Sequence, residues 1–329
     1  MTTGPGDRTQ VAALRTAAQA ASQAPSVHNT QPWRWRLGPE QLELFAERER
    51  QLKIADPAGR LLTISCGAAL HHTLVTLAAA GWVTRVSRLP DDDPDHLATV
   101  RLDARGPADP HAQQLAEAIP KRRTDRRSPS AQPVPAQVLA ELRADCEAQQ
   151  IHLHLLPPEQ VADLAAAAER ANEQSTANPA AHQELRYWIE GPHPPGTGMP
   201  PAVLPDQPGH TRVPTREFGL PGTLPLRNGG DRAATYAVFF GEHDTAEAWL
   251  RAGEALSATW LAATRHGLAL LPFSGVMEVP VTRIFLTKLL SGIGYPYLVA
   301  RLAYPDPHQP APPRTPRLAP TETIQEEGG

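Results

Sequence analysis

Residues 24–33 read Ala-Pro-Ser-Val-His-Asn-Thr-Gln-Pro-Trp and form the most specific stretch of the chain. They fall between a helix predicted over 8–23 and a strand predicted over 33–37, so the stretch connects the two. Its prolines fix the backbone, and its Asn and Gln offer both hydrogen-bond donors and acceptors. Such a loop suits a heteroaromatic ligand whose edge alternates C=O and N–H groups. The alternative interpretation is an ordinary helix-capping loop around a buried Trp33.

A second stretch, residues 121–127, reads Lys-Arg-Arg-Thr-Asp-Arg-Arg and precedes a helix predicted over 135–149. Five cations and one hydroxyl in seven residues can hold a phosphate through forked guanidinium contacts. The alternative interpretation is a solvated charge run on a linker.

The composition excludes several classes of protein. The chain has 329 residues, of which 41% are hydrophobic and 20% charged, so it can bury a sizeable core. Its net charge of −4 argues against general binding to nucleic acid or to anionic membranes. The start of the chain lacks a signal-peptide pattern, no run of 18 apolar residues occurs, and Cys66 and Cys146 lie far apart. These features predict a cytoplasmic protein without a membrane span or a disulfide framework.

The prolines divide the chain into blocks. Ten of the 36 prolines lie in residues 192–231, and seven more lie in residues 305–320. Elsewhere, predicted helices and strands alternate, which indicates an α+β protein with α/β-type layers and helices packed on a mixed sheet. The predicted helices are 8–23, 67–81, 111–119, 135–149, 159–171, 180–189, 249–267 and 281–290, and the predicted strands are 33–37, 42–47, 98–103, 151–155, 235–240 and 297–304.

One pattern occurs twice. The pattern Gly-x-Ala-Leu-x-x-Thr begins at Gly67 and is followed by a further glycine at Gly81. The same pattern begins at Gly253 and is followed by Gly267, so every match is 186 residues apart. The repeat predicts an internal duplication, although chance matches between Ala-rich helices are the alternative. Two related halves would place a central site at their junction.

Taken together, the two specific stretches resemble the FMN-dependent nitroreductase family. Residues 24–33 look like its flavin-binding signature, and residues 122–126 look like its Arg-Arg-Ser-x-Arg/Lys signature, which holds the FMN phosphate and the pyrimidine side of the ring. Residues 271–275, Leu-Pro-Phe-Ser-Gly, are similar to the family's turn beside flavin N5. Residues 314–317, Arg-Thr-Pro-Arg, resemble its C-terminal contact to the phosphate. The resemblance touches most of the chain outside 192–231.

The order of the signatures departs from the ordinary family pattern. Common nitroreductases carry the Arg-Arg-Ser signature first, and two subunits share each FMN, whereas here the Ala-Pro-Ser signature comes first and the arginine signature lies at mid-chain. This arrangement looks like the Acg-type branch, in which two fused halves imitate the homodimer, a lid covers the flavin and some members are suspected of sequestering it. The resemblance divides the chain into a first half (1–120), the start of the second half (121–191), a Pro/Gly-rich lid or insert (192–231), the rest of the second half (232–304) and a Pro-rich tail (305–329). A plain linker is the alternative for 192–231.

The resemblance implies a set of cofactor contacts and no catalytic side chain or metal ligand. Arg123, Arg126 and Arg317 are assigned to phosphate or pyrimidine charge, Arg122 to the N1–C2=O edge, and the backbone N–H of Gly275 to N5. Trp188, Arg212, Arg216 and Phe218 are candidates for covering a planar ligand. The full set of predicted FMN contacts is Pro25, Ser26, Asn29, Gln31, Arg122, Arg123, Thr124, Arg126, Pro272, Ser274, Gly275 and Arg317.

The function implied is ping-pong hydride transfer from NAD(P)H through FMN to a small electron acceptor such as a nitroaromatic or a quinone. A flavin-sequestering protein whose lid blocks NAD(P)H is the alternative. A third hypothesis is a non-enzymatic protein whose Pro-rich segments bind a partner as polyproline II. No nucleic-acid or membrane partner is expected, and a pseudo-dimeric monomer and a homodimer both stay open.

Overall fold

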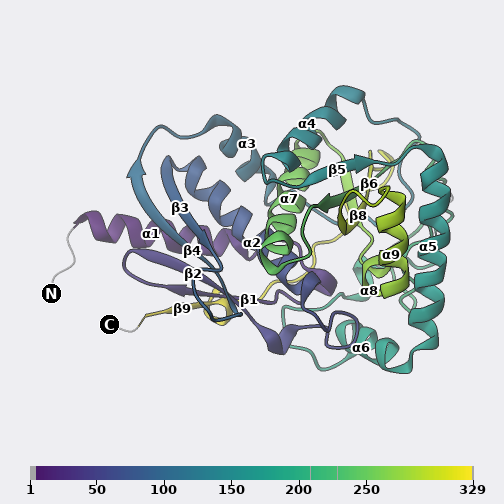
Figure 1. The fold of residues 1–329 in the computed structure, drawn as a ribbon, viewed down its shortest axis with the longest axis horizontal. Helices are drawn as coiled ribbons and strands as arrows, with labels where there is room; N and C mark the ends of the chain where they lie inside the picture. The colour runs from purple at the N-terminus through teal and green to yellow at the C-terminus, as the bar shows by residue number, and fades with distance from the viewer. Residues whose placement is uncertain (1–4, 208, 228, 328–329) are drawn as a thin grey trace.

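The computed structural model describes residues 5–207, 209–227 and 229–327. Two β-sheets lie on either side of a central pair of long helices, α2 (Arg60–Ala79) and α7 (Ala246–Arg265) (Figure 1). The α+β class predicted from the sequence is therefore confirmed, and the sheet that receives the C-terminal strand is mixed.

The first sheet has the strand order β3-β4-β2-β1-β9. Its pairs are antiparallel, except that β9 near the C-terminus runs parallel to β1. Its strands are β1 (Trp33–Leu37), β2 (Gln41–Ala46), β3 (Trp82–Arg88), β4 (His96–Arg105) and β9 (Ile324–Glu326). Helix α1 (Pro5–Ala21) precedes β1 in the chain, and helix α3 (Pro110–Ala118) follows β4.

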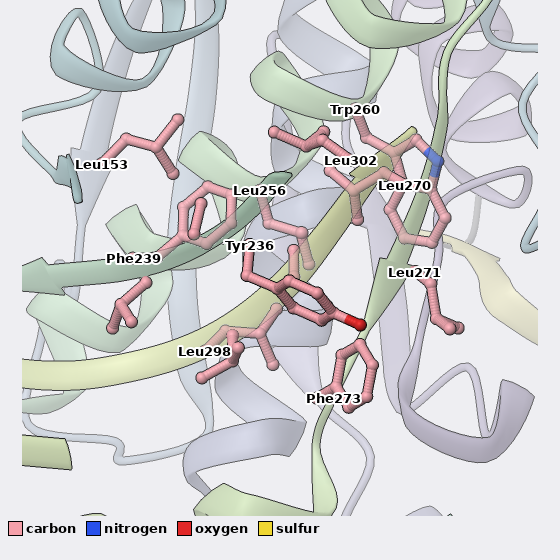
Figure 2. Close-up of a cluster of buried hydrophobic side chains, with 14 of the residues drawn as sticks. Leu153, Tyr236, Phe239, Leu256, Trp260, Leu270, Leu271, Phe273, Leu298 and Leu302 are labelled. Atoms are coloured by element: carbon pink, nitrogen blue, oxygen red, sulfur yellow. The ribbon is translucent and has the colours of Figure 1, made fainter. Parts of the chain in front are cut away.

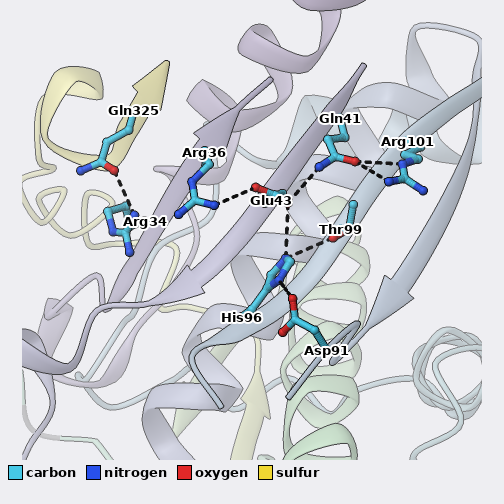
Figure 3. A network of polar contacts seen from close by, with 9 residues as sticks. All are labelled: Arg34, Arg36, Gln41, Glu43, Asp91, His96, Thr99, Arg101 and Gln325. Carbon is cyan, nitrogen blue, oxygen red and sulfur yellow. Dashed lines mark hydrogen bonds and ion pairs between the residues drawn. The ribbon is translucent and has the colours of Figure 1, made fainter. Parts of the chain in front are cut away.

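Apolar and polar side chains alternate along β1, so one face of this sheet is apolar and the other is polar. Trp33 and Trp35 are fully buried in a core with residues of α1 and α2. The opposite face carries a polar network in which Arg34 donates to Gln325 of β9 and His96 contacts Asp91 (Figure 3). Contacts through Glu43 join β1, β2 and β4, and the separate contact between Arg34 and Gln325 ties the short C-terminal strand to β1 (Figure 3).

The second sheet has the order β5-β6-β8-β7 and is entirely antiparallel. Its strands are β5 (His152–Leu155), β6 (Thr235–Gly241), β7 (Ala269–Pro272) and β8 (Tyr295–Ala303). Side chains from β6, β7, β8 and α7 fill the larger core, with Tyr236, Phe239 and Trp260 among the fully buried ones (Figure 2). The other helices here are α4 (Ala136–Glu147), α5 (Pro158–Ala177), α6 (Pro179–Glu190), α8 (Gly275–Glu278) and α9 (Pro280–Leu289).

The two halves share one topology. The order β3-β4-β2-β1 of the first sheet corresponds, strand for strand along the chain, to β7-β8-β6-β5 of the second. The helices α2 and α7 have 20 residues each. The first and last residues of α7 follow those of α2 by the same number of positions that separates the two copies of the sequence repeat. Each helix is followed by a glycine with a left-handed backbone, Gly81 at φ 77° and Gly267 at φ 72°.

The repeated glycines lie where α2 and α7 cross. A Cβ on Gly67 would fall 1.9 Å from the backbone oxygen of Leu250, and one on Gly253 would fall 1.9 Å from that of Ile64. Only glycine allows the backbones to approach this closely. One turn further on, His71 Nδ1 and Ser257 Oγ are hydrogen-bonded at 2.9 Å, again 186 positions apart.

The helix α2 is long and apolar enough to cross a membrane, but 83% of its apolar window is buried inside the protein. It packs against α1, α3 and α7, as expected of the central helix of a core.

The elements predicted from the sequence are present, with ends displaced by a few residues in most cases and by up to seven at the start of α2. The strands β3, β7 and β9 were missed, and so were short helical segments such as α8, α10 (Pro320–Thr323) and the 3-10 turns Val27–Asn29, Arg48–Arg50 and Pro201–Val203. The strand β7 has only four residues, and β9 consists of Ile-Gln-Glu, so neither contains enough alternation to be recognised.

The Pro/Gly-rich insert has little regular structure but a small core of its own. Met199, Val203 and Leu204 pack with Leu185 and Ile189 of α6, and Phe218 and Leu220 lie against this cluster. The insert is therefore docked on α6.

Candidate functional site

A large cavity lies between the two halves and takes lining residues from both. Its empty space is about 1190 Å³, the open mouth included. The helix α2 contributes Leu61, Ile64 and Ser65, and α7 contributes Leu256 and Trp260. The insert contributes Met199 and residues 214–216 and 218, and the C-terminal tail contributes Thr315 and Arg317. The position agrees with the prediction that a central site would lie at the junction.

The structure brings ten of the twelve predicted cofactor contacts to this cavity. They are Pro25, Ser26, Asn29, Arg122, Thr124, Arg126, Pro272, Ser274, Gly275 and Arg317. Gln31 and Arg123 do not line it. Because the structure contains no ligand, the contacts themselves stay a prediction.

Two polar residues of the 24–33 loop hold other parts of the chain in place. The Gln31 side chain is fully buried, and it donates to the Gly196 oxygen at 2.7 Å and accepts from the Leu318 N–H at 3.0 Å. Asn29 donates to the Gly198 oxygen at 3.0 Å and accepts from Arg317 at 2.9 Å. The loop therefore anchors both the insert and the tail, a structural role that its sequence did not reveal.

The backbone of this loop is strained. His28, Asn29 and Gln31 have left-handed φ values of 47°, 58° and 50°. Such conformations are unfavourable for most residues other than glycine, although Asn and His adopt them more readily, and strained residues cluster at binding and catalytic sites. The Ser26 hydroxyl stabilises the loop by accepting the Gln31 N–H at 2.9 Å.

Three arginines bring positive charge into the cavity without a carboxylate partner. Among the described residues, Arg122, Arg126 and Arg317 form no ion pair within 4.0 Å and donate instead to backbone carbonyls such as that of Gln23. Burial lowers the pKa of Arg122 to about 9 and the pKa of Arg126 and Arg317 to about 10. Positive charge held in this way favours an anionic ligand.

Several donors in the same place are buried and unsatisfied. Arg122 Nε, Arg317 Nε and Trp260 Nε1 have no hydrogen-bond partner in the described part of the chain. The Arg122 guanidinium lies 4.5 Å from the centre of the Trp260 ring, so a cation–π contact replaces an ion pair. Buried donors are rarely left unpaired, and a ligand that accepts hydrogen bonds in the cavity would satisfy this group.

A smaller adjoining cavity extends the positive surface. Its empty space is about 430 Å³, again with open solvent included, and it shares Arg122, Arg126 and Arg317 with the large cavity. Arg123 and Arg314 also line it. Arg123 thus lies beside the predicted phosphate contacts, although outside the main cavity. The prediction that 121–127 is a solvated charge run does not fit the burial of Arg122, which is 7% exposed.

Sequence reasoning did not single out every residue that lines the cavity. Trp260 lies inside the helix predicted over 249–267, and Asn172 lies one residue beyond the helix predicted over 159–171; neither carries a local signal. His28 is buried, and burial together with the charges of Arg216 and Arg126 lowers the pKa of His28 well below its ordinary value. It therefore faces the cavity as a neutral imidazole.

The four residues proposed to cover a planar ligand divide into two pairs. Arg216 and Phe218 line the cavity. Trp188 stacks on His193, and Arg212 donates to the backbone oxygen of Asp231, so these two stabilise the insert instead.

The other candidates have structural partners. His152 packs against the Phe240 ring, and His154 contacts Gln160 at 2.7 Å. No group of three or more potential metal ligands occurs within residues 5–207, 209–227 and 229–327. Both cysteines are buried and unpaired, and burial raises the pKa of the Cys146 thiol to about 12.

Comparisons with known proteins identify the family to which the chain belongs. No model of a protein family matches the chain. A Mycobacterium tuberculosis protein named "Putative NAD(P)H nitroreductase Rv3131" is 37% identical over 321 residues, which cover 95% of this chain and 91% of the relative. The M. tuberculosis protein named "Putative NAD(P)H nitroreductase acg" is 31% identical over 92% of each chain.

Solved structures resemble parts of the fold. A nitroreductase with bound FMN from Bacteroides fragilis is 17% identical, with a TM-score of 0.39 over 61% of this chain and 93% of that chain. The NADPH:FMN oxidoreductase from Vibrio harveyi is 14% identical, with a TM-score of 0.36 over 62% of this chain and 74% of that chain. Because the curated relatives match along nearly their whole length, the protein belongs to the nitroreductase family that includes the M. tuberculosis acg protein.

Proposed function

We propose that the protein is an FMN-binding oxidoreductase that passes electrons from NAD(P)H to a small-molecule acceptor such as a nitroaromatic or a quinone. One observation carries this proposal above the others. Arg122, Arg126 and Arg317 have no ion-pair partner among the described residues, and they line a cavity that also has unsatisfied donors and apolar walls. A planar heteroaromatic ring with a phosphate at one end has the chemistry that such a cavity requires.

The residues present fit FMN. A phosphate monoester carries close to two negative charges at neutral pH, and the arginine cluster would neutralise them through charge-assisted hydrogen bonds. Leu256, Leu271 and Trp260 provide apolar surface for the ring. FMN, when bound, supplies the hydride chemistry between NAD(P)H and the acceptor. The protein's part is to orient the ring, to exclude water and to hold positive charge beside it.

The names of the curated relatives support NAD(P)H as the electron donor. Both curated relatives reported above are named as NAD(P)H nitroreductases. No side chain of the cavity needs to act as an acid or a base in this proposal.

We further propose that residues 1–120 and 121–304, with 192–231 inserted, are duplicated halves that hold a single FMN in one chain, which makes the pseudo-dimeric monomer the favoured state. The equal strand orders and the crossing of Gly67 with Gly253 support the duplication. A cytoplasmic location is consistent with two buried, unpaired cysteines.

A flavin-holding protein is the second candidate, and the insert favours it. Met199, Thr215 and Phe218 line the cavity from the insert, so they would cover a bound ring and restrict access by a nicotinamide. The Pro-rich insert and tail both contact the cavity or the loop that supports it. That engagement within the chain favours either flavin hypothesis over a polyproline binding protein.

Replacement of Arg126 by alanine tests the phosphate assignment. We expect the dissociation constant of FMN, measured by fluorescence titration of the apoprotein, to rise about 10- to 150-fold, because a charge-assisted contact of about 1.5–3 kcal/mol is lost. Arg143→Ala on the exposed face of α4 is the matched control and should leave the constant unchanged. An Arg126→Ala variant that binds FMN like the wild type would remove Arg126 from the site.

A further inference from the structure

Arg216 enters the cavity from the insert, and its charge is near enough to Arg126 to lower the pKa of that arginine. It lines the large cavity but not the smaller one that Arg122, Arg126 and Arg317 share. Its Nη2 lies 3.1 Å from the position that a Cβ on Gly275 would occupy. Arg216 is therefore next to the turn that carries Ser274 and Gly275.

The partner of Arg216 lies behind it. Arg216 forms an ion pair with Glu278, and their side chains are 13% and 7% exposed. Glu278 is absent from the lining of the cavity, whereas Arg216 belongs to it. Arg216 therefore connects the cavity lining to a carboxylate outside that lining.

Most donors of Arg216 are available to a ligand. A guanidinium has five N–H donors in a planar fork. In the described part of the chain, Glu278 is the partner with which Arg216 forms an ion pair or a hydrogen bond. The backbone next to it is fixed, because Asn172 of α5 donates to the Thr215 oxygen at 2.9 Å.

We propose that Arg216 is a specificity-determining residue that binds the anionic group of the second substrate, an aromatic electron acceptor bearing a carboxylate. This inference rests on the proposed function, because the phosphate of FMN occupies the other arginines and leaves Arg216 to the acceptor. Glu278 competes with the substrate anion for the same guanidinium. It keeps the buried cation paired while the acceptor position is empty and weakens anion binding by that competition.

Two matched probes test the assignment on the oxidised, FMN-loaded protein without an electron donor. The probes are 4-nitrobenzoate and 4-nitrobenzamide, which have similar shapes and differ in charge. Calorimetric titration of the wild type should give binding at least about tenfold tighter for 4-nitrobenzoate. Arg216→Gln should abolish this preference, and Arg216→Lys should restore part of it. Arg227→Gln, at an exposed arginine of the insert outside the cavity, should leave the preference intact.

The variant Glu278→Gln gives a result of opposite sign. Removing the competing carboxylate should tighten binding of 4-nitrobenzoate severalfold and leave binding of 4-nitrobenzamide unchanged. Equal or undetectable binding of the probes to the wild type, or an undiminished preference in Arg216→Gln, would overturn the assignment. The flavin absorption of each sample distinguishes failure of this inference from failure of the proposed function. If FMN is bound but Arg216 has no effect on probe binding, only this inference is overturned. If the protein takes up no FMN, the proposed function is overturned as well.

Discussion

Arg122 differs from Arg127 and Arg88 in what neutralises it. Arg127 pairs with Asp125, and Arg88 pairs with Glu254, in both cases through two hydrogen bonds at 2.7–2.9 Å. Arg122 lies against Trp260 and has no acidic partner among the described residues. An unpaired buried cation lowers the stability of the empty protein, and an anionic ligand would recover that stability.

Asp56 is the buried carboxylate for which the structure makes a clear pH prediction. It accepts the Leu62 N–H at 2.9 Å, yet burial raises its pKa from 3.8 to about 6. The folded protein thus binds more protons at Asp56 than the unfolded chain between pH 4 and 6, and the contribution of Asp56 to stability is lost as the pH rises through this range.

Comparison with Asp56→Asn isolates this contribution. From pH 4.5 to pH 7, we expect the free energy of unfolding of the wild type to fall by about 2 kcal/mol relative to the variant, because asparagine does not ionise. Urea denaturation at the two pH values provides the measurement. A difference between the two proteins that is independent of pH would show that Asp56 titrates near its ordinary value.

The pair α2 and α7 is the element on which the arrangement of the halves depends. Gly67 and Gly253 meet at the crossing, and the walls of the cavity come from the same two helices. An added methyl group at either glycine would overlap a backbone oxygen, which a side-chain rotation cannot relieve.

Gly67→Ala and Gly253→Ala should each lower the free energy of unfolding by about 2–3 kcal/mol, because the helices must separate and the higher helix propensity of alanine offsets only part of that cost. Thermal or urea unfolding provides the measurement. Gly230→Ala is the control, since nothing lies within 4 Å of a Cβ there. If the variants at the crossing are as stable as the control, the helices do not pack as closely as described.

The sequence was most informative where a pattern is local. The strand β1 was predicted with its observed ends, because Trp-Arg-Trp-Arg-Leu alternates apolar and charged residues, and the structure shows the matching alternation in burial. The repeated glycines predicted two related helices but not that they cross at Gly67 and Gly253. Ten of the residues predicted to contact FMN line the cavity, and all ten belong to compact motifs. Trp260 was missed because an isolated aromatic residue in a predicted helix looks like an ordinary core residue.

Over the whole molecule, segments distant in sequence complete both the sheet and the site. The tail leaves β8 in the second sheet, passes the cavity at Arg317 and adds β9 to the first sheet (Figure 1). Gln31 receives the Leu318 N–H, so the tail is fixed by the same loop that lines the cavity. This crossing depends on tertiary contacts with residues about 290 positions away, which no local pattern in the tail encodes.

The ion pair between Arg88 of β3 and Glu254 of α7 joins the two halves directly. Both oxygens of Glu254 accept at 2.7 Å, and Glu254 is 1% exposed. Glu254→Gln should lower the free energy of unfolding by about 2–4 kcal/mol, because Arg88 then loses its counter-charge in a buried place. Glu247→Gln, which breaks the exposed pair with Arg251, should cost less than about 0.5 kcal/mol in the same urea titration. Equal effects of the two substitutions would contradict the role given to Glu254.

The visible absorption spectrum of the purified protein, recorded before and after anaerobic addition of NADPH, tests the central claim most directly. The account predicts flavin bands, if necessary after incubation with FMN, and these bands should bleach when NADPH is added. Bands that persist with NADPH but bleach with dithionite would select the flavin-holding alternative or a different donor. A protein that shows no flavin bands even after incubation with FMN would contradict the account.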